Sequence, residues 1–172
     1  MICWRRPKNL REYLIRAKLP KENPDRKSRR SKIGFKHCER NCNMCKFSPR
    51  FTDHITSSVT KERVPIVSNL NCLSKNVIYC ITCTKQSGSC KDSPQYIGQT
   101  GRRICERFSE HKNSIKKNSQ KAVGEHFSLP GHKQCDLQIV PFEEIRSKNP
   151  FVRISREKYY IHKLNPRINV RV

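Results

Sequence analysis

The 172-residue sequence predicts a small α+β domain, a three-stranded, mainly antiparallel sheet flanked by helices, preceded by a basic arm and a cysteine knuckle. Three observations favour this fold. Runs of β-branched, aromatic and apolar residues at 77–83, 95–98 and 136–142 are typical of strands. Apolar residues at helical spacing occur at 103–117 and 150–164. Ten cysteines occur in a chain that is only 34% hydrophobic, so bound metal is expected to supplement a thin core.

The first 36 residues are expected to form a basic arm. Leu10 and Leu14 lie one helical turn apart, which predicts a short basic helix over 4–19 with Pro7 in its first turn. Residues 20–36 are rich in Lys, Arg and Ser and almost free of apolar side chains, which predicts a flexible linker. The linker's charge can still bind phosphate.

Residues 37–75 form a cysteine-rich linker with a possible zinc knuckle. Three ligands have knuckle spacing: Cys38, Cys42 and Cys45. Zinc commonly takes four ligands, and the candidates for the fourth are Cys72, His37 and His54. A zinc ion here would anchor the basic arm to the domain that follows. Short strands are expected near Ile55 and at 64–67.

Residues 76–172 form the predicted globular domain. Strands at 77–83 and 95–98 make a hairpin with a long polar loop. A helix at about 103–117 places Ile104, Phe108, His111 and Ile115 along one side. A shorter helix is expected within 120–129, followed by the strand at 136–142. The last helix, 150–164, ends at Asn165-Pro166.

Charge and composition narrow the function classes. The chain has a formal net charge of +23, with a surplus of 12 basic residues before residue 51 and 11 after it. This predicts a polyanionic partner, nucleic acid rather than an anionic membrane. The sequence has neither an apolar run of roughly 18 residues nor a signal-peptide core, so we expect no membrane span and no secretion. In the cytosol or nucleus the cysteines stay reduced and favour zinc over disulfides.

Several polar residues of this domain together suit phosphodiester hydrolysis. Tyr79 and Tyr96 lie on neighbouring strands, and Arg107 and His111 lie four residues apart on one helix face. Glu157 lies in the last helix. A carboxylate can hold a divalent cation, an arginine can neutralise a phosphate, and a phenol can activate water.

The same residues belong to five motifs that occur in order along 76–170. These are Val77-Ile78-Tyr79, Tyr96-Ile97-Gly98-Gln99-Thr100, the pair Arg107 and His111, Glu157, and Asn169. In this order they resemble the GIY-YIG nuclease module. The surrounding sequence is similar to the GIY-YIG endonuclease of Penelope-like retroelements, in Gly101-Arg102, in His126-Phe127-Ser128-Leu129-Pro130-Gly131-His132 and around Arg156. The segments at 6–11 and 71–79 resemble the region that joins that element's reverse transcriptase to its nuclease.

The resemblance implies a role for each catalytic residue. Glu157 would be the sole protein carboxylate on one Mg²⁺ or Mn²⁺. Tyr79 would act as general base or orient the attacking water, with support from Tyr96. Arg107 would bind the scissile phosphate. His111 would relay a proton or brace its helix, and Asn169 would hold Glu157 or Tyr79 in place.

The resemblance also implies DNA contacts around the second motif. Gly98 would let the backbone come close to DNA. The neighbouring DNA-contact candidates are Thr100, Arg102 and Arg103.

A structural zinc site of two cysteines and two histidines is a further implication of the resemblance. His126 and His132 match its histidine half. The cysteine half is either Cys80 with Cys83 or Cys83 with Cys90. Residues three apart on a strand point to opposite faces, so we favour Cys83 and Cys90, which flank the hairpin loop.

The sequence therefore predicts a nuclear, metal-dependent DNA endonuclease. It would leave a 3′-hydroxyl that primes reverse transcription when a reverse transcriptase domain is joined to it in the full-length element. The alternative is a catalytically inactive, zinc-stabilised nucleic-acid-binding module from a degenerate element. DNA sequence preference, single- or double-strand cutting and oligomeric state are left open.

Overall fold

A three-stranded antiparallel sheet forms the centre of the computed structural model, which describes residues 32–86 and 88–169. Strand β6 (Val77–Cys83) lies between β7 (Gln95–Thr100) and β8 (Leu137–Glu144). All residues of β6 except Thr82 are buried, because both edges are paired and both faces are covered. The predicted α+β fold with a three-stranded sheet is confirmed.

Three α-helices lie in the regions where the sequence predicts helices. Helix α2 spans Ile104–Lys116, α3 spans Ala122–Phe127 and α4 spans Pro150–Leu164. The buried side of α2 consists of the four predicted residues, Ile104, Phe108, His111 and Ile115. Helix α4 begins with the Asn149 side chain accepting a hydrogen bond from the Phe151 N–H, and it ends at Asn165 in the left-handed conformation.

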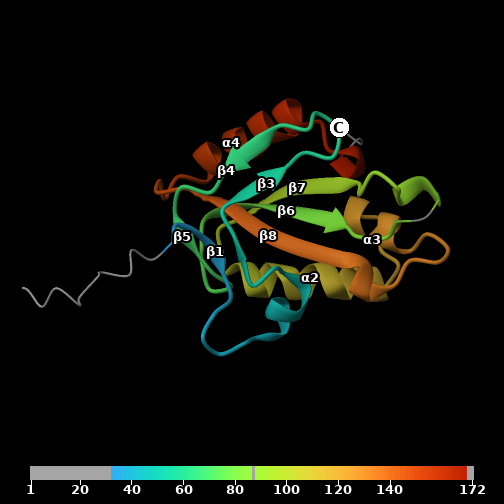
Figure 1. Cartoon of the computed structure of the whole chain (residues 1–172). Helices are drawn as coiled ribbons and strands as arrows, with labels where there is room; N and C mark the ends of the chain where they lie inside the picture. Colours follow the sequence, from blue (N-terminus) through green and yellow to red (C-terminus); the bar gives the residue numbers. More distant parts are fainter. Residues whose placement is uncertain (1–31, 87, 170–172) are drawn as a thin grey trace, which may run out of the picture. The chain divides into compact units, whose positions relative to one another are not determined.

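Helices α2 and α4 lie on opposite sides of the sheet (Figure 1). Alternate residues of β7 account for this arrangement, because successive side chains of a strand point to opposite faces. Gln99 accepts a hydrogen bond from Arg153 of α4, whereas the ring of Tyr79, which contacts α2, passes over Gly98. The edge strand β7 therefore separates the two helices that carry the predicted catalytic residues.

The register of the sheet places Tyr79 opposite Gly98 on β7 and opposite Pro141 on β8. The pairing with β8 shifts between Ile78 and Tyr79, which is a β-bulge. Proline has no N–H to donate and is tolerated at bulges and in edge strands, and Pro141 occupies both kinds of position.

The cysteine-rich segment is more ordered than its sequence suggested. Its short strands are β1 (Gly34–Lys36), β2 (Phe51–Thr52), β3 (His54–Thr56), β4 (Arg63–Pro65) and β5 (Asn69–Leu70). Strands β3 and β4 confirm the expectation near Ile55 and 64–67. The prediction that the irregular linker continues to residue 36 is wrong at its end, because β1 pairs with both β2 and β5.

Short 3-10 helices complete the described chain. They are η1 (Asn43–Phe47), η2 (Gly88–Cys90), η3 (Gln134–Asp136) and η4 (Arg167–Asn169). The predicted helix at 4–19 and the linker up to residue 31 lie outside the described residues. Within the described part of the chain, no helix has the length and apolarity that crossing a membrane requires.

One hydrophobic core includes residues from both sides of position 76. Phe35, Met44 and Leu70 are almost completely buried and belong to the same cluster as the apolar residues of β6.

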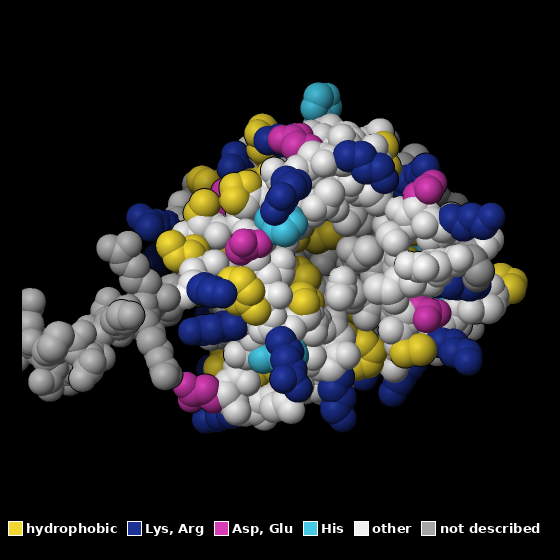
Figure 2. Space-filling view, in the orientation of Figure 1, with side chains coloured by type: hydrophobic (Ala, Val, Ile, Leu, Met, Phe, Trp, Pro, Cys, Tyr) yellow, Lys and Arg dark blue, Asp and Glu magenta, His cyan; other side chains and the backbone are white. Residues whose placement is uncertain are grey.

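The surface is rich in positive charge. In the space-filling view, Lys and Arg side chains are spread over the visible face and acidic side chains are few (Figure 2).

The β3–β4 hairpin is tied to the end of α4. The hydroxyl of Ser57, only 1% exposed, donates a hydrogen bond to the carbonyl oxygen of Leu164 at 2.8 Å. Lys163 Nζ lies 2.7 Å from Glu62 Oε1. Because the last carbonyls of a helix lack partners within it, Ser57 satisfies a group that would otherwise be buried without a hydrogen bond.

This bond predicts the effect of a Ser57→Ala substitution. The free energy of unfolding, measured by urea denaturation, should fall by about 1–3 kcal/mol, because the Leu164 carbonyl loses its donor and the N–H groups of Val59 and Thr60 lose their acceptor. Ser58→Ala is the matched control, since the neighbouring Ser58 hydroxyl is buried without a hydrogen-bond partner. That variant should stay within about 0.5 kcal/mol of the wild type. Equal losses in the two variants would contradict the capping role.

Candidate active site

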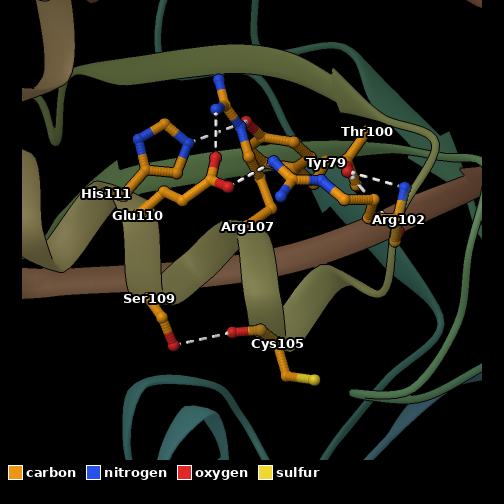
Figure 3. Close-up of polar contacts among 8 residues, drawn as sticks. All are labelled: Tyr79, Thr100, Arg102, Cys105, Arg107, Ser109, Glu110 and His111. Carbon is orange, nitrogen blue, oxygen red and sulfur yellow. Dashed lines mark hydrogen bonds and ion pairs between the residues drawn. The ribbon is translucent and has the colours of Figure 1, made fainter.

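A chain of hydrogen bonds centred on Tyr79 joins the middle strand to helix α2 (Figure 3). The hydroxyl of Tyr79, which is fully buried, lies 2.7 Å from His111 Nε2. Arg107 Nε donates to the same hydroxyl at 3.1 Å. Three of the residues that the sequence analysis proposed therefore meet at one oxygen atom.

Burial determines the protonation of this chain. Burial, followed by the positive charge of Arg107, lowers the pKa of His111 to about 3, so the imidazole is neutral near pH 7. Burial also raises the pKa of Tyr79, which keeps the phenol protonated. Since the guanidinium of Arg107 can only donate, the consistent assignment has Arg107 donating to Tyr79 Oη and Tyr79 donating to His111 Nε2.

Glu110 fixes the position of Arg107, and the sequence analysis missed this residue. Arg107 Nη1 donates to Glu110 Oε2 at 2.7 Å, and Arg102 Nη2 pairs with the other carboxylate oxygen (Figure 3). The Arg107 hydrogen bond is the main cause that lowers the pKa of the Glu110 carboxyl. The three-residue spacing from Arg107 on a predicted helix was the available signal.

A hollow of about 270 Å³ opens beside this network. Its lining includes Tyr96, Arg107, Glu110, His111 and Lys121. A larger hollow, about 620 Å³, is lined by Cys80, Thr82 and residues of the β3–β4 hairpin, on the other face of the sheet. We assign the site to the smaller hollow because it contains the arginine and tyrosine groups that suit phosphate.

Tyr96 lies next to the same network. Its ring centroid is 6.4 Å from that of Tyr79 and 5.8 Å from that of His111. Burial raises the pKa of its phenol, with Glu157 acting in the same direction. The two tyrosines thus line the same side of the sheet.

Close packing within the protein explains why residue 98 is a glycine. The prediction from the sequence was instead a close approach of DNA to this residue. A Cβ atom at this position would lie 2.6 Å from Tyr79 Oη and 2.7 Å from a ring carbon of Tyr96. No ordinary side chain fits there, so the absence of a Cβ lets the two tyrosines pack against β7.

Glu157 comes to the site from helix α4. Its side chain is half-buried, and burial raises the pKa of its carboxyl. A hydrogen bond from the Gln99 backbone and the charges of Arg107 and Arg153 oppose that rise. The carboxylate in turn acts on the pKa of Tyr79 and Tyr96, so it shares their electrostatic environment.

Arg153, one helical turn before Glu157, is a second residue that the sequence analysis missed. Its Nε donates to Gln99 Oε1 at 2.5 Å and its Nη1 donates to Asn76 Oδ1 at 3.0 Å. These bonds fasten α4 to the sheet at the level of Glu157.

The Glu157 carboxylate is the type of ligand that a divalent cation such as Mg²⁺ or Mn²⁺ takes. These ions prefer oxygen ligands and usually keep several waters while they bind one or two carboxylates and phosphate oxygens. A single half-buried carboxylate on a rigid helix leaves room for those other ligands.

Two predicted site residues have other partners than expected. The side-chain amide of Asn169 accepts from Ile97 N at 2.7 Å and donates to Ile97 O at 2.8 Å, so it holds β7 and does not bond Glu157 or Tyr79. Thr100 is 5% exposed, and its hydroxyl accepts from Arg102 N at 3.1 Å. This hydrogen bond gives the Thr100 hydroxyl a role in the turn after β7. Arg102 and Arg103 are exposed.

The first cysteine cluster contains the predicted knuckle and Cys72. The ligand atoms of Cys38, Cys42, Cys45 and Cys72 all lie within 4.8 Å of one another. The other candidates for the fourth position have different partners: His37 Nε2 lies 3.0 Å from Ser48 O, and His54 Nδ1 lies 2.6 Å from Asp53 Oδ1.

The second cluster consists of Cys83, Cys90, His126 and His132, whose ligand atoms also lie within 4.8 Å of one another. Cys80 is not a member, and its sulfur lies 3.7 Å from the Thr82 hydroxyl on the other face. Each cluster has the four-ligand composition of a structural zinc site. The Nδ1 atom of His132 lies 3.1 Å from the Leu129 carbonyl, a contact that typically orients a metal-bound histidine.

Known proteins resemble part of this chain. The GIY-YIG catalytic domain matches residues 75–169. A solved structure, the catalytic domain of the homing endonuclease I-TevI, is similar at 23% identity with a TM-score of 0.43, covering 55% of this chain and 94% of that chain. A search among curated proteins gives no match. The chain belongs to the GIY-YIG family, and its domain is that of a phosphodiester-hydrolysing DNA endonuclease that uses a divalent metal.

The buried His111 predicts a pH dependence of stability. Its pKa falls from 6.5 to about 3 on folding, so between these values the unfolded chain binds a proton that the folded chain does not. The free energy of unfolding therefore decreases as the pH falls through this range, by up to about 1.4 kcal/mol per pH unit for one proton.

Urea denaturation at about pH 7 and about pH 5 tests this prediction. His111→Gln, which keeps a hydrogen-bond acceptor for Tyr79, should lose less stability over this range than the wild type. His162→Gln, at an exposed position of α4, should keep the wild-type dependence. The prediction fails if His111→Gln also keeps it.

Proposed function

We propose that the chain nicks DNA at the site formed by Tyr79, Arg107, His111 and Glu157, and that the nick leaves a 3′-hydroxyl. The observation that carries this proposal is the meeting of Arg107 and His111 at the Tyr79 hydroxyl, beside the Glu157 carboxylate. All four residues lie within the matched GIY-YIG range.

Tyr79 orients the attacking water in this proposal. A phenol can act as a general base or can orient the attacking water, and burial favours the second role here. It raises the pKa of Tyr79 and lowers that of His111, so a proton shift from phenol to imidazole is disfavoured. His111 accepts the phenol proton in a hydrogen bond and thereby fixes where the Tyr79 oxygen lone pairs point.

Arg107 binds the scissile phosphate, and Glu157 would hold the divalent cation. Glu110 and Tyr79 already hold the Arg107 guanidinium in place, so little side-chain freedom remains to be lost when phosphate binds. The bound cation supplies positive charge for the developing charge on the phosphate oxygens. Asn169 supports the site indirectly, through its two hydrogen bonds to the backbone of Ile97.

Positive charge around the site supports DNA as the substrate. Arg102 and Arg103 are exposed at the start of α2, and Lys121 lines the hollow beside Arg107. With a net charge of +23 the chain should bind DNA largely through phosphate, with strong dependence on salt.

The proposed biological context is a Penelope-like retroelement. It rests on the flanking motifs of the sequence, which resemble that element's endonuclease and the region joining it to a reverse transcriptase. In such an element the 3′-hydroxyl would prime reverse transcription at the nicked chromosomal DNA, and the protein would act in the nucleus.

Zinc is the proposed structural metal of the two cysteine-containing clusters. Their composition, their short mutual distances and the low hydrophobic content of the chain support this. The Cys83, Cys90, His126 and His132 cluster would hold the β6–β7 loop against α3, and the four-cysteine cluster would stabilise the segment before β6.

Loss of the Glu157 carboxylate predicts loss of nicking. Glu157→Gln should reduce the rate on supercoiled plasmid with Mg²⁺ by at least about 10²-fold, because the cation loses its protein ligand. DNA affinity should stay near that of the wild type. Glu106→Gln, the same change at an exposed position of α2, is the matched control and should nick normally. If the wild type nicks no faster than Glu157→Gln while both bind DNA, the chain acts as an inactive binding module.

Metal analysis tests the zinc proposal independently of activity. The purified chain should contain two zinc ions, one for each cluster. His132→Ala should lose one of them, whereas Cys135→Ala, which removes an exposed cysteine outside both clusters, should lose none. A wild-type chain without zinc would refute the proposal.

A further inference from the structure

We propose that the four-cysteine cluster positions the N-terminal end of helix α2, and through it Arg107 and His111, so that zinc in this cluster controls turnover by the nuclease. This inference rests on the proposed function, because it concerns how the proposed catalytic residues are held. It assigns the cluster a part in the reaction that goes beyond stabilising the fold.

The cluster is compact, and three of its four cysteines are buried whereas Cys42 is partly exposed. Cys45 is its centre, with its sulfur 3.4 Å from that of Cys72, 3.7 Å from that of Cys38 and 3.9 Å from that of Cys42. Cys45 is 3% exposed and Cys72 is completely buried. A zinc ion bound by the four sulfurs would displace their thiol protons to solvent and would link η1 to the segment that follows β5.

That segment caps helix α2. The first N–H groups of a helix have no partner within it, and Arg103 at the N-cap offers no side-chain hydrogen bond. The missing acceptors come from the cysteine segment instead. Ile104 N–H donates to Ser74 O at 3.0 Å, and Cys105 N–H donates to the carbonyl of the cluster residue Cys72 at 3.1 Å.

The capping segment is itself a tight turn. Ser74 N–H donates to Asn71 O at 3.1 Å, and Asn71 N–H donates to the Ser74 hydroxyl at 3.0 Å. The Asn71 side chain accepts from Leu73 N–H at 2.8 Å. Because these bonds make the turn rigid, a displacement of Cys72 is passed on to Ser74, and both carbonyls move relative to α2.

A second contact joins the cluster to the same helix. Phe47, two residues after Cys45, packs on Phe108 of α2 with 5.1 Å between ring centroids. Lys112 Nζ lies 4.9 Å from the Phe47 ring. The cluster therefore holds α2 at its first turn through the cap and about one turn later through Phe47.

The proposed catalytic residues Arg107 and His111 lie on α2, within two turns of the capped first turn. Arg107 follows the capped Cys105 by two residues, and His111 follows one turn later. Their bonds to the Tyr79 hydroxyl, 3.1 and 2.7 Å, have little tolerance for a shift of the helix, since hydrogen bonds weaken steeply with length and angle. A small displacement of α2 would leave the phenol and the guanidinium misplaced for the reaction.

The test uses Cys45→Ala in the full chain, because this change removes the central ligand and leaves the capping carbonyls intact. We expect the loss of one zinc ion and roughly tenfold faster hydrogen exchange at the amides of Ile104 and Cys105, by analogy with the loss of a helix cap. The turnover number for nicking should fall, with the affinity for DNA unchanged, since binding depends on surface charge.

His132→Ala is the matched control. It removes one zinc ion from the other cluster, and exchange at Ile104 and Cys105 should stay at the wild-type rate. The proposal is overturned if Cys45→Ala loses zinc without faster exchange at these two amides, or if His132→Ala accelerates them equally.

Amides of strand β6 report whether Cys45→Ala has simply failed to fold. If they also exchange faster, the wild type is compared after removal of zinc by a chelator and after its return, and equal exchange at Ile104 and Cys105 in the two states overturns the proposal. Zinc content and exchange do not depend on nicking. An inactive wild-type chain would therefore refute the proposed nuclease function while the coupling between cluster and helix is still measured.

Discussion

The hydroxyl of Tyr79 is buried, and its need for hydrogen bonds fixes how strand β6 and helix α2 pack against each other. A phenol without hydrogen bonds in an apolar interior is costly, so strand β6 and helix α2 must stay in the one arrangement that gives this oxygen its partners. Arg107 donates to it and His111 accepts from it. The same requirement explains Gly98, because the ring of Tyr79 needs the space that a Cβ would occupy. Stability and the arrangement for chemistry thus have a common origin in this part of the molecule.

Acidic residues are scarce in this chain, and the few near the site organise its positive charge. Glu110 pairs with Arg102 and Arg107 and so sets the direction of a guanidinium that an excess of cations would otherwise repel. Glu157 lies between the charges of Arg107 and Arg153, which oppose the effect of burial on its pKa. The surface charge suits sequence-independent attraction of DNA, whereas these few carboxylates determine where the phosphate and a cation can be held.

The four-cysteine cluster and the cluster of two cysteines and two histidines occur in a chain that is only 34% hydrophobic. One cluster lies in the segment before β6 and reaches α2 through Cys72, and the other joins the β6–β7 loop to α3 and the loop after it. Each connects segments that are distant in the sequence, as a structural metal does in small domains. The segment 32–75 is consequently part of the same core as the catalytic domain, with Phe35, Met44 and Leu70 packed into it.

The fold of the catalytic domain and the residue types of the proposed site could be predicted without the structure, because both follow from local sequence patterns. The apolar run at 77–83, the helical spacing of Ile104, Phe108 and His111, and the ordered motifs need no knowledge of distant contacts. The hydrogen-bond partners of these residues could not be predicted in the same way, because they come from distant parts of the chain. Asn169 bonds the backbone of Ile97, and the carbonyls of Ser74 and Cys72 cap α2. Such bonds depend on which backbone groups folding leaves without a partner in the interior, and no local pattern contains that information.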